Sequence, residues 1–271
     1  MKDLLVNTWL GQVGLGFREA LAVHLTAFHH LEALPTMAND QIARKLLEGL
    51  CVDGGIFVDV GAHIGSVIAG VARHSRPGKI VAVEAMPDKA AVLRKRFADA
   101  EVHAVAVSDH EGSAEFIVDL ARPGCSSLDP ETSSRTHSSK VISVPVTLLD
   151  KIAPHQGVDL VKLDVEGAEL GVLRGSESLV ACSRPTIMFE SGAEEMAGFT
   201  RQDLWHWFEQ RDYELVLPNR VAHLAPKLSL ACFLDAHEYP RATTNYFAIA
   251  RERRDAVRAR ARSVLGLNLS S

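Results

Sequence analysis

Four ionisable side chains stand close together in the stretch VKLDVEGAEL, residues 161–170, which begins as an apolar segment. Lys162, Asp164 and Glu166 alternate, so an extended chain would place them on one face, and Glu169 follows on the next segment. Carboxylates grouped in this way can accept a proton from a substrate or ligate a hard cation such as Mg²⁺. In the structural alternative, Lys162 pairs with an acid, and the two glutamates favour the start of a helix through its dipole.

A second polar interruption is FVDVGAHIG, residues 57–65, followed by the helical pattern SVIAGVARHS. Gly61 permits a tight turn and a close approach of the backbone to a ligand, and the first N–H groups of the helix would then face that ligand. His63 titrates near neutral pH and is a candidate general base. Many α/β domains use such a turn only to pack a strand against a helix, and His63 would then simply cap that helix.

An acidic residue ends the next apolar segment, KIVAVEAMP, where Glu84 lies nineteen residues after Gly65. This is the position from which a carboxylate binds the ribose hydroxyls of a nucleoside. Asp59 adds a second carboxylate to the first motif. The dinucleotide pattern G-x-G-x-x-G is absent, and the motif has too few glycines for a pyrophosphate. The acids suit a cofactor with an amino-acid end and no phosphate, which indicates S-adenosylmethionine (SAM).

The elements that must position these residues are short apolar segments that alternate with helical ones from residue 56 onward. Nearly continuous apolar segments are typical of strands buried on both faces, so they predict an α/β fold with a mostly parallel seven-stranded sheet and helices on both faces. Ligands bind at the carboxyl ends of such strands. Asp164 and Glu190, at the ends of the fourth and fifth segments, are therefore expected at the same edge. The predicted strands are 56–60, 79–84, 102–107, 158–164, 185–190, 213–217 and 245–250.

An insertion interrupts this alternation between the third and fourth strands. The segments 114–118 and 141–146 predict an extra strand pair. They flank the polar stretch 123–140, which is either a functional loop or a disordered one without a role.

The two ends of the chain differ from the middle. Residues 1–50 predict a helical extension, in which Pro35 ends one helix and Asn39 or Asp40 caps another. We expect the main domain to span residues 51–250. We expect residues 251–271 to form a basic helical tail that presents either a solvated face or a contact for an anionic partner or a membrane surface.

The composition narrows the classes of protein. The 271 residues are 47% hydrophobic, enough for a large core, and the formal net charge of −5 gives no basic footprint for nucleic acid. The four cysteines lack zinc-site spacing, so we expect free thiols in a reducing compartment. No segment reaches the roughly 20 apolar residues of a membrane span, and the first residues lack the pattern of a signal peptide. We therefore expect a cytoplasmic protein; its oligomeric state is not predicted.

The motifs DVGAHIG and VKLDVEGAELGVLRG, with VAVEAMP between them, resemble the FkbM family of SAM-dependent methyltransferases. AVAVSDHEGSAEF and VPVTLLDKI follow the order of that family, and the resemblance covers about residues 55–192. His63 stands where the family commonly has Asn, and Ala85 stands where it commonly has Pro. Neither departure removes a carboxylate.

The resemblance implies a Rossmann-like class I methyltransferase fold, SAM as cofactor, and methyl transfer to a hydroxyl of a sugar or a polyketide-type natural product. Glu84 would bind the ribose hydroxyls. The methionine and ribose side would include Asp59, Gly61 and Gly65, and Val107, Ser108 and Asp109 would border the adenine. His63, Ala85 and Asp164 complete the expected cofactor contacts.

Methyl transfer to a hydroxyl requires an in-line geometry and the removal of the hydroxyl proton. One hypothesis uses a side-chain base, with His63, Asp164 and Glu190 as candidates. The other uses a divalent metal such as Mg²⁺, bound by Asp164 and Glu190 with Glu166 or Glu169. Two further classes stay open: an NAD-dependent oxidoreductase, and a nucleoside-binding module without catalytic activity.

Overall fold

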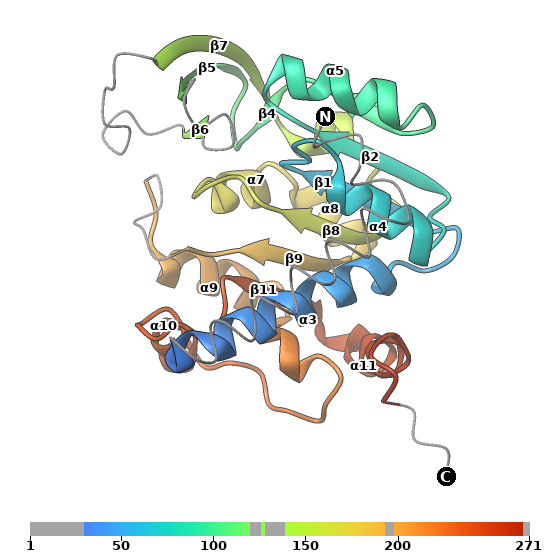
Figure 1. Ribbon diagram of the computed structural model, residues 1–271, viewed down its shortest axis with the longest axis vertical. Coiled ribbons are helices and arrows are strands. Elements are labelled where there is room, and N and C mark those ends of the chain that lie inside the picture. Colours follow the sequence, from blue (N-terminus) through green and yellow to red (C-terminus); the bar gives the residue numbers. More distant parts are fainter. Residues whose placement is uncertain (1–29, 120–125, 128–138, 193–197, 268–271) are drawn as a thin grey trace.

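The computed structural model describes residues 30–119, 126–127, 139–192 and 198–267. Its main sheet has seven strands in the order β10-β11-β9-β8-β1-β2-β3. Figure 1 shows the middle of this order, from β11 through β9, β8 and β1 to β2. Neighbouring strands are parallel except at β11, which is antiparallel to both β9 and β10, so the predicted mostly parallel sheet is confirmed. The strands are β1 (Ile56–Val60), β2 (Lys79–Val83), β3 (Glu101–His103), β8 (Val158–Leu163), β9 (Thr186–Glu190), β10 (Tyr213–Val216) and β11 (Asn245–Ala250).

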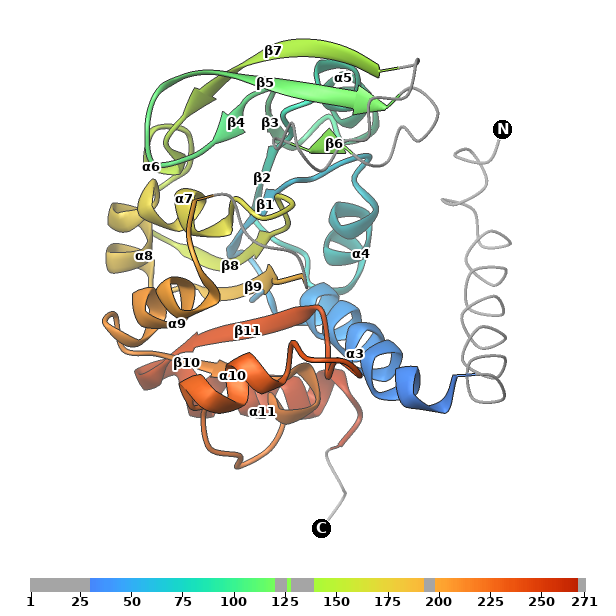
Figure 2. The same cartoon turned by 90° about the vertical axis from the view of Figure 1, so that its left-hand side faces the viewer.

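Helices cover both faces of this sheet, as predicted. Figure 2 shows α3 and α4 on one side of the sheet and α7, α8 and α9 on the other. Each side has its own layer of buried apolar side chains, one including Leu46 and Ile68 and the other Leu170 and Leu204. The helices are α3 (Leu34–Leu50), α4 (Ser66–His74), α5 (Pro87–Arg96), α6 (Leu149–Ile152), α7 (Glu169–Arg174), α8 (Glu177–Ser183), α9 (Arg201–Glu209), α10 (Leu230–Asp235) and α11 (Arg254–Val264), with 3₁₀ turns η1 (Leu31–Ala33), η2 (Pro218–Arg220) and η3 (Arg251–Arg253).

The single strand predicted over 102–107 is wrong, because the chain there contributes to two sheets. β3 ends at His103, and β4 (Ala106–Val107) instead pairs with the inserted strand β7 (Ser139–Thr147). The strand pair predicted at 114–118 and 141–146 lies within β5 (Gly112–Asp119) and β7, which are antiparallel. With β6 (Ser126–Ser127) they form a second sheet in the order β4-β7-β5-β6. Most of the 123–140 stretch lies outside the described residues.

The helix break predicted at Pro35 is also wrong. α3 begins at Leu34, and Pro35 occupies its first turn, where the N–H that proline lacks would have no helical partner. Asn39 and Asp40 therefore lie inside the helix and do not cap it. Instead, Asn39 Nδ2 donates to the Ala242 carbonyl at 2.8 Å, which ties α3 to the segment before β11. The first helix predicted in the 1–50 extension would run up to Pro35, and most of it falls on residues 1–29, outside the described residues.

The arginines of the basic tail contact the protein's own main chain. Arg254 donates to the carbonyl of Val221 and Arg260 to that of Leu50, at 3.1 and 2.9 Å. α11 also buries Val257 and Ala261 in the apolar layer that contains α3. Part of the predicted solvated face is thus used to hold α11 against α3 and the segment at Val221. The division into 1–50, 51–250 and 251–271 stays a prediction.

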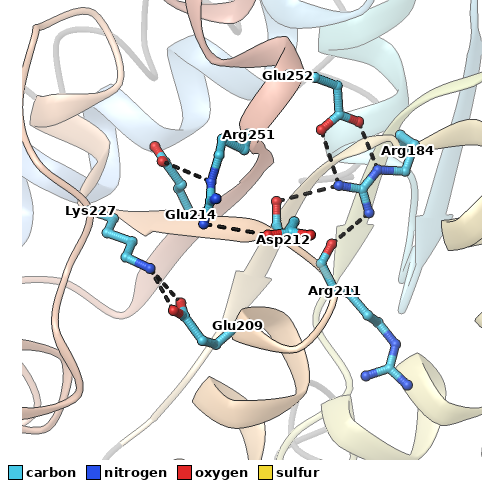
Figure 3. A network of polar contacts seen from close by, with 8 residues as sticks. All are labelled: Arg184, Glu209, Arg211, Asp212, Glu214, Lys227, Arg251 and Glu252. Carbon is cyan, nitrogen blue, oxygen red and sulfur yellow. Dashed lines mark hydrogen bonds and ion pairs between the residues drawn. The ribbon is translucent and has the colours of Figure 1, made fainter.

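The edge of the sheet where the parallel strands begin carries a network of paired charges. Figure 3 shows Arg184 bonded to the carboxylate of Glu252 and to the carbonyls of Arg211 and Asp212. Glu177 and the side chain of Arg211 pair beside it, around a hollow of about 320 Å³. Because each charged group in this network has a partner of opposite charge or a carbonyl, we assign the network a role in stabilising the fold.

Among the described residues, no helix is both long and apolar enough to span a membrane.

Candidate functional site

A cavity of about 430 Å³ lies at the carboxyl ends of β1, β2 and β8. This is the edge at which the sequence placed its polar motifs, and the topology explains the placement because parallel strands end together. The wall also includes the chain from Val105 to Val107, where the second sheet begins. Of the predicted catalytic and cofactor-binding residues, those that line the cavity are Gly61, His63, Glu84, Ala85, Val107 and Asp164.

Gly61 is required where β1 and β8 end. Its φ is +80°, and a Cβ there would lie 1.9 Å from the carbonyl oxygen of Asp164. The predicted cofactor residue Gly65 lies outside the cavity lining. Its φ is +79°, and a Cβ would lie 2.3 Å from the Phe97 ring, so this glycine allows the start of α4 to pack against the end of α5. Thus only the first glycine of the motif faces the cavity.

Glu84 faces the cavity with its carboxylate held by two backbone donors. His63 N–H donates to Oε2 at 2.7 Å, and Met86 N–H donates to Oε1 at 2.9 Å. The residue is only 6% exposed. Each carboxylate oxygen has a second lone pair, so the group can still accept one further hydrogen bond at each oxygen. This fixed pair of acceptors suits two neighbouring hydroxyl groups.

Asp59 lies beneath the cavity, outside its lining, and contacts it through Lys162. The Lys162 ammonium is 3.3 Å from Asp59 Oδ1 and 3.1 Å from Asp164 Oδ2, and it donates to the Gly61 carbonyl at 3.0 Å. Burial raises the pKa of Asp59, with Lys162 opposing that shift. Burial would lower the pKa of Lys162, but Asp59 and Asp164 outweigh it and raise that pKa. Lys162 is therefore a buried cation held by two acids.

Asp164 and Glu190 share a hydrogen bond, as expected from their common edge. Burial and the neighbouring Asp164 raise the pKa of Glu190 to about 8. Burial opposes ionisation of Asp164 as well, but Lys162 and the bond from Glu190 lower its pKa. At pH 7 Glu190 thus carries the proton and Asp164 is ionised. Asp164 lines the cavity, whereas Glu190 is outside the cavity lining and contacts Asp164.

The corner after β8 is held by Glu169. Glu166 and Gly167 both have positive φ, +55° and +95°, and Glu169 Oε1 accepts from the N–H groups of Val165 and Gly167 at 3.2 and 3.3 Å. Burial raises the pKa of Glu169 to about 7. Glu169 is therefore a structural residue, and Glu166 lines the cavity.

The candidate metal ligands do not converge on a binding position. In the part of the chain that the structure describes, no three His, Cys, Asp or Glu side chains are arranged to hold an ion. The oxygens of Asp164 bond Lys162 and Glu190, and Glu169 bonds its own loop.

His63 lies exposed at the mouth of the cavity, and its φ is +50°. Partial burial of its ring, followed by the charge of Lys89, lowers its pKa. The ring is therefore unprotonated at neutral pH and can accept a proton. Lys89 and Ser66 also line the cavity, although sequence reasoning missed them. Their place in the first turns of α5 and α4, directly after the two loop motifs, is the signal that identifies them.

Ser108 and Asp109, expected beside an adenine, lie outside the cavity lining. A Cβ at Gly175 of the neighbouring turn would lie 2.1 Å from the Ser108 carbonyl, so this segment is packed against the end of α7. Asp109 is exposed and pairs with His110 at 2.9 Å. Only Val107 of this predicted group reaches the cavity.

A family model described as the methyltransferase FkbM domain matches residues 59–215, more than half of the chain. The match begins at Asp59 and includes every cavity-lining residue from Val60 to Ala168. No curated protein matches the sequence.

Solved structures with a similar arrangement include an FkbM methyltransferase from Methylobacillus flagellatus, with 16% identity and a TM-score of 0.47. The similarity covers 73% of this chain and 44% of that one, so the chain spans less than half of its length. A TehB-like SAM-dependent methyltransferase from Corynebacterium glutamicum has 13% identity, a TM-score of 0.38, and coverage of 77% and 85%. An rRNA methylase from Streptococcus thermophilus has 12% identity and a TM-score of 0.38. The similarity covers 78% of this chain and 95% of that one.

Proposed function

The chain belongs to the FkbM methyltransferase family and has the class I methyltransferase fold, and from this premise we propose that it is a SAM-dependent O-methyltransferase. The methyl acceptor would be a hydroxyl group of a sugar or of a polyketide-type natural product. The observation that carries this proposal is the fixed Glu84 carboxylate, which faces the same cavity as Asp164.

The cavity residues fit the parts of SAM. Glu84 would accept hydrogen bonds from the two ribose hydroxyls. The loop of Gly61 and His63 would border the amino-acid end, where the absence of a side chain at Gly61 leaves the backbone accessible. Val107 and Met86 supply apolar surface for the adenine. When bound, SAM supplies a methyl group already activated for displacement.

The protein must then orient a hydroxyl group and take its proton. A base is most effective when its pKa lies near the working pH. We assign this role to His63, because its ring is unprotonated at neutral pH and lies at the cavity mouth. Asp164 is held ionised beside Lys162, which makes it a weaker base and a better hydrogen-bond acceptor for orienting the hydroxyl.

Calorimetric titration with SAM, S-adenosylhomocysteine and NAD tests the cofactor assignment. We expect SAM and S-adenosylhomocysteine to bind and NAD not to bind. Tight binding of NAD alone would contradict the SAM assignment and favour an NAD-dependent oxidoreductase. Radiolabelled methyl transfer from SAM to a panel of sugars, glycosides and macrolides then tests the acceptor class. Binding of SAM with transfer only to RNA would overturn the O-methylation proposal.

The compartment and the excluded partners remain part of this proposal. Cys51, Cys182 and Cys232 are unpaired thiols, which suits a reducing compartment such as the cytoplasm. The net charge of −5 and the carboxylates of Asp164 and Glu166 at the cavity disfavour a polyanionic acceptor such as nucleic acid.

A further inference from the structure

A buried hydrogen bond directly follows Glu190 in the chain. Ser191 is 1% exposed and His237 is 4% exposed, and Ser191 Oγ lies 2.8 Å from His237 Nε2. Neither residue lines the cavity. The two residues lie 46 positions apart in the sequence, so no local sequence pattern predicts this contact.

The surroundings of the His237 ring fix which nitrogen carries the hydrogen. Nδ1 lies 2.7 Å from the Phe233 carbonyl, which can only accept, so Nδ1–H donates there and Nε2 accepts from the Ser191 hydroxyl. The ring is stacked on Tyr246, with centroids 5.0 Å apart. Burial lowers the pKa of His237 to about 4, and Arg201 and Arg241 act in the same direction. The imidazole therefore stays neutral and holds one orientation at neutral pH.

The backbone at Ser191 is fastened from a second side. Ser191 N–H donates to the Thr244 carbonyl at 2.8 Å, and Asn245 pairs with Glu190 in the sheet. Asp40 Oδ1 on α3 accepts from Thr244 N–H at 3.3 Å and from Asn245 Nδ2 at 3.1 Å. The end of β9 is thus held by α3 through β11 and by His237, just after α10.

This fastening has a consequence for the carboxyl pair in the cavity wall. Glu190 faces Asp164, Glu166 and Glu169, all of them acids. These acids would repel an ionised Glu190, so the protonated form is favoured while the carboxyl stays within hydrogen-bond reach of Asp164. The position of the main chain at the end of β9 sets whether that hydrogen bond can form.

We propose that Ser191 and His237 are positioning residues that hold the carboxyl group of Glu190 against Asp164. The inference deepens the proposed function, because Asp164 is the group assigned there to orient the acceptor hydroxyl. It gives two residues outside the cavity a defined positioning role: Ser191 fixes the strand end, and His237 fixes Ser191.

The test follows the titration of Glu190 by carbon-13 NMR of the protein labelled at its glutamate side-chain carboxyls, with Glu190→Gln identifying the resonance. In Ser191→Ala, we expect the Glu190 pKa to fall by about one unit or more toward its ordinary value. SAM affinity, measured by calorimetry, should change less than about twofold, because neither positioning residue lines the cavity. Ser75→Ala is the matched control, since this hydroxyl is equally buried and donates to the Glu48 carbonyl away from the cavity.

Ser191→Ala leaves His237 Nε2 without a donor and can impair folding for that reason. The double variant Ser191→Ala/His237→Phe removes both partners and should show the same fall in the Glu190 pKa. An unchanged Glu190 pKa in either folded variant, or an equal fall in Ser75→Ala, would overturn the positioning role. The titration does not depend on methyl transfer, so wild-type protein that fails to bind SAM would refute the proposed function alone.

Discussion

The ammonium of Lys162 lies 3.3 Å from Oδ1 of Asp59, and neither side chain is more than 6% exposed. The two residues are direct register partners in the parallel pair of β1 and β8. Lys162 also contacts Asp164 and the Gly61 carbonyl. One buried cation therefore joins the two loops that border the cavity, and its loss should affect both the stability of the protein and the shape of the site.

Replacement of Lys162 by Met should destabilise the protein by about 3–5 kcal/mol, because it leaves Asp59 buried without its cation. The free energy of unfolding in urea measures this loss. Lys227→Met is the control: Lys227 pairs with Glu209 at 2.6 Å, but both side chains are about one-third exposed, so the expected cost is about 1 kcal/mol or less. Equal losses in the two variants would contradict the role given to Lys162.

Gly61→Ala should both destabilise the protein and abolish SAM binding, because the new Cβ collides with the Asp164 carbonyl. Gly54→Ala isolates the backbone contribution. Gly54 has φ +76°, but a Cβ there would meet no other part of the protein within 4 Å, so the exchange should cost only about 1–2 kcal/mol and leave SAM affinity unchanged. Thermal unfolding and calorimetric titration distinguish the two variants. SAM binding by Gly61→Ala with wild-type affinity would refute the close-approach argument.

Glu84→Ala should weaken SAM binding by roughly 100-fold, corresponding to the loss of about 3 kcal/mol from two charge-assisted hydrogen bonds. The variant also frees the N–H groups of His63 and Met86, so its fold should be checked by circular dichroism. Glu101→Ala is the control, because Glu101 is an exposed acid that pairs with Lys79 away from the cavity. Unchanged affinity in a folded Glu84→Ala protein would count against the ribose assignment.

His63→Asn should retain SAM affinity within a few-fold and slow methyl transfer by about 100-fold or more, since a positioned base contributes factors of that size. Asparagine tolerates the left-handed backbone that His63 adopts, with φ of +50°, so the exchange should not disturb the loop. Single-turnover transfer to an acceptor found in the panel is the measurement. A transfer rate equal to that of the wild type would move the base role from His63 to Asp164.

The raised pKa of Glu190 predicts how stability changes with pH. The folded protein holds this proton up to about pH 8, whereas the unfolded chain releases it near pH 4.5. The contribution of Glu190 to the free energy of unfolding is therefore full below pH 4.5 and is lost as the pH rises from 4.5 to about 8. Glu190→Gln removes this dependence. Comparing urea unfolding at pH 5.5 and 8.5, we expect the wild type to lose about 1–2 kcal/mol more than the variant, a modest figure because Glu190 is partly solvated. Identical pH profiles would refute the raised pKa.

The sequence by itself determined the sheet and the edge that carries the site. Apolar segments of strand length define the seven strands, and the rule that parallel strands end together placed Gly61, Glu84 and Asp164 at one edge. Local chemistry also marked Gly61, because a non-glycine residue rarely adopts its φ of +80°. The split of the third strand could not be predicted in this way, since β4 leaves the main sheet only because β7, about 40 residues later, pairs with it.

Only the tertiary structure decided which acids face the cavity and which protons they hold. Strand alternation assigns a side chain to a face, but the register of β1 against β8 put Asp59 beneath Lys162 and out of the cavity. The pKa of Glu190 likewise depends on Asp164, which comes from another strand. Electrostatic interactions and burial act through space between groups that are distant in the chain, and so the protonation of this site is a property of the packed molecule.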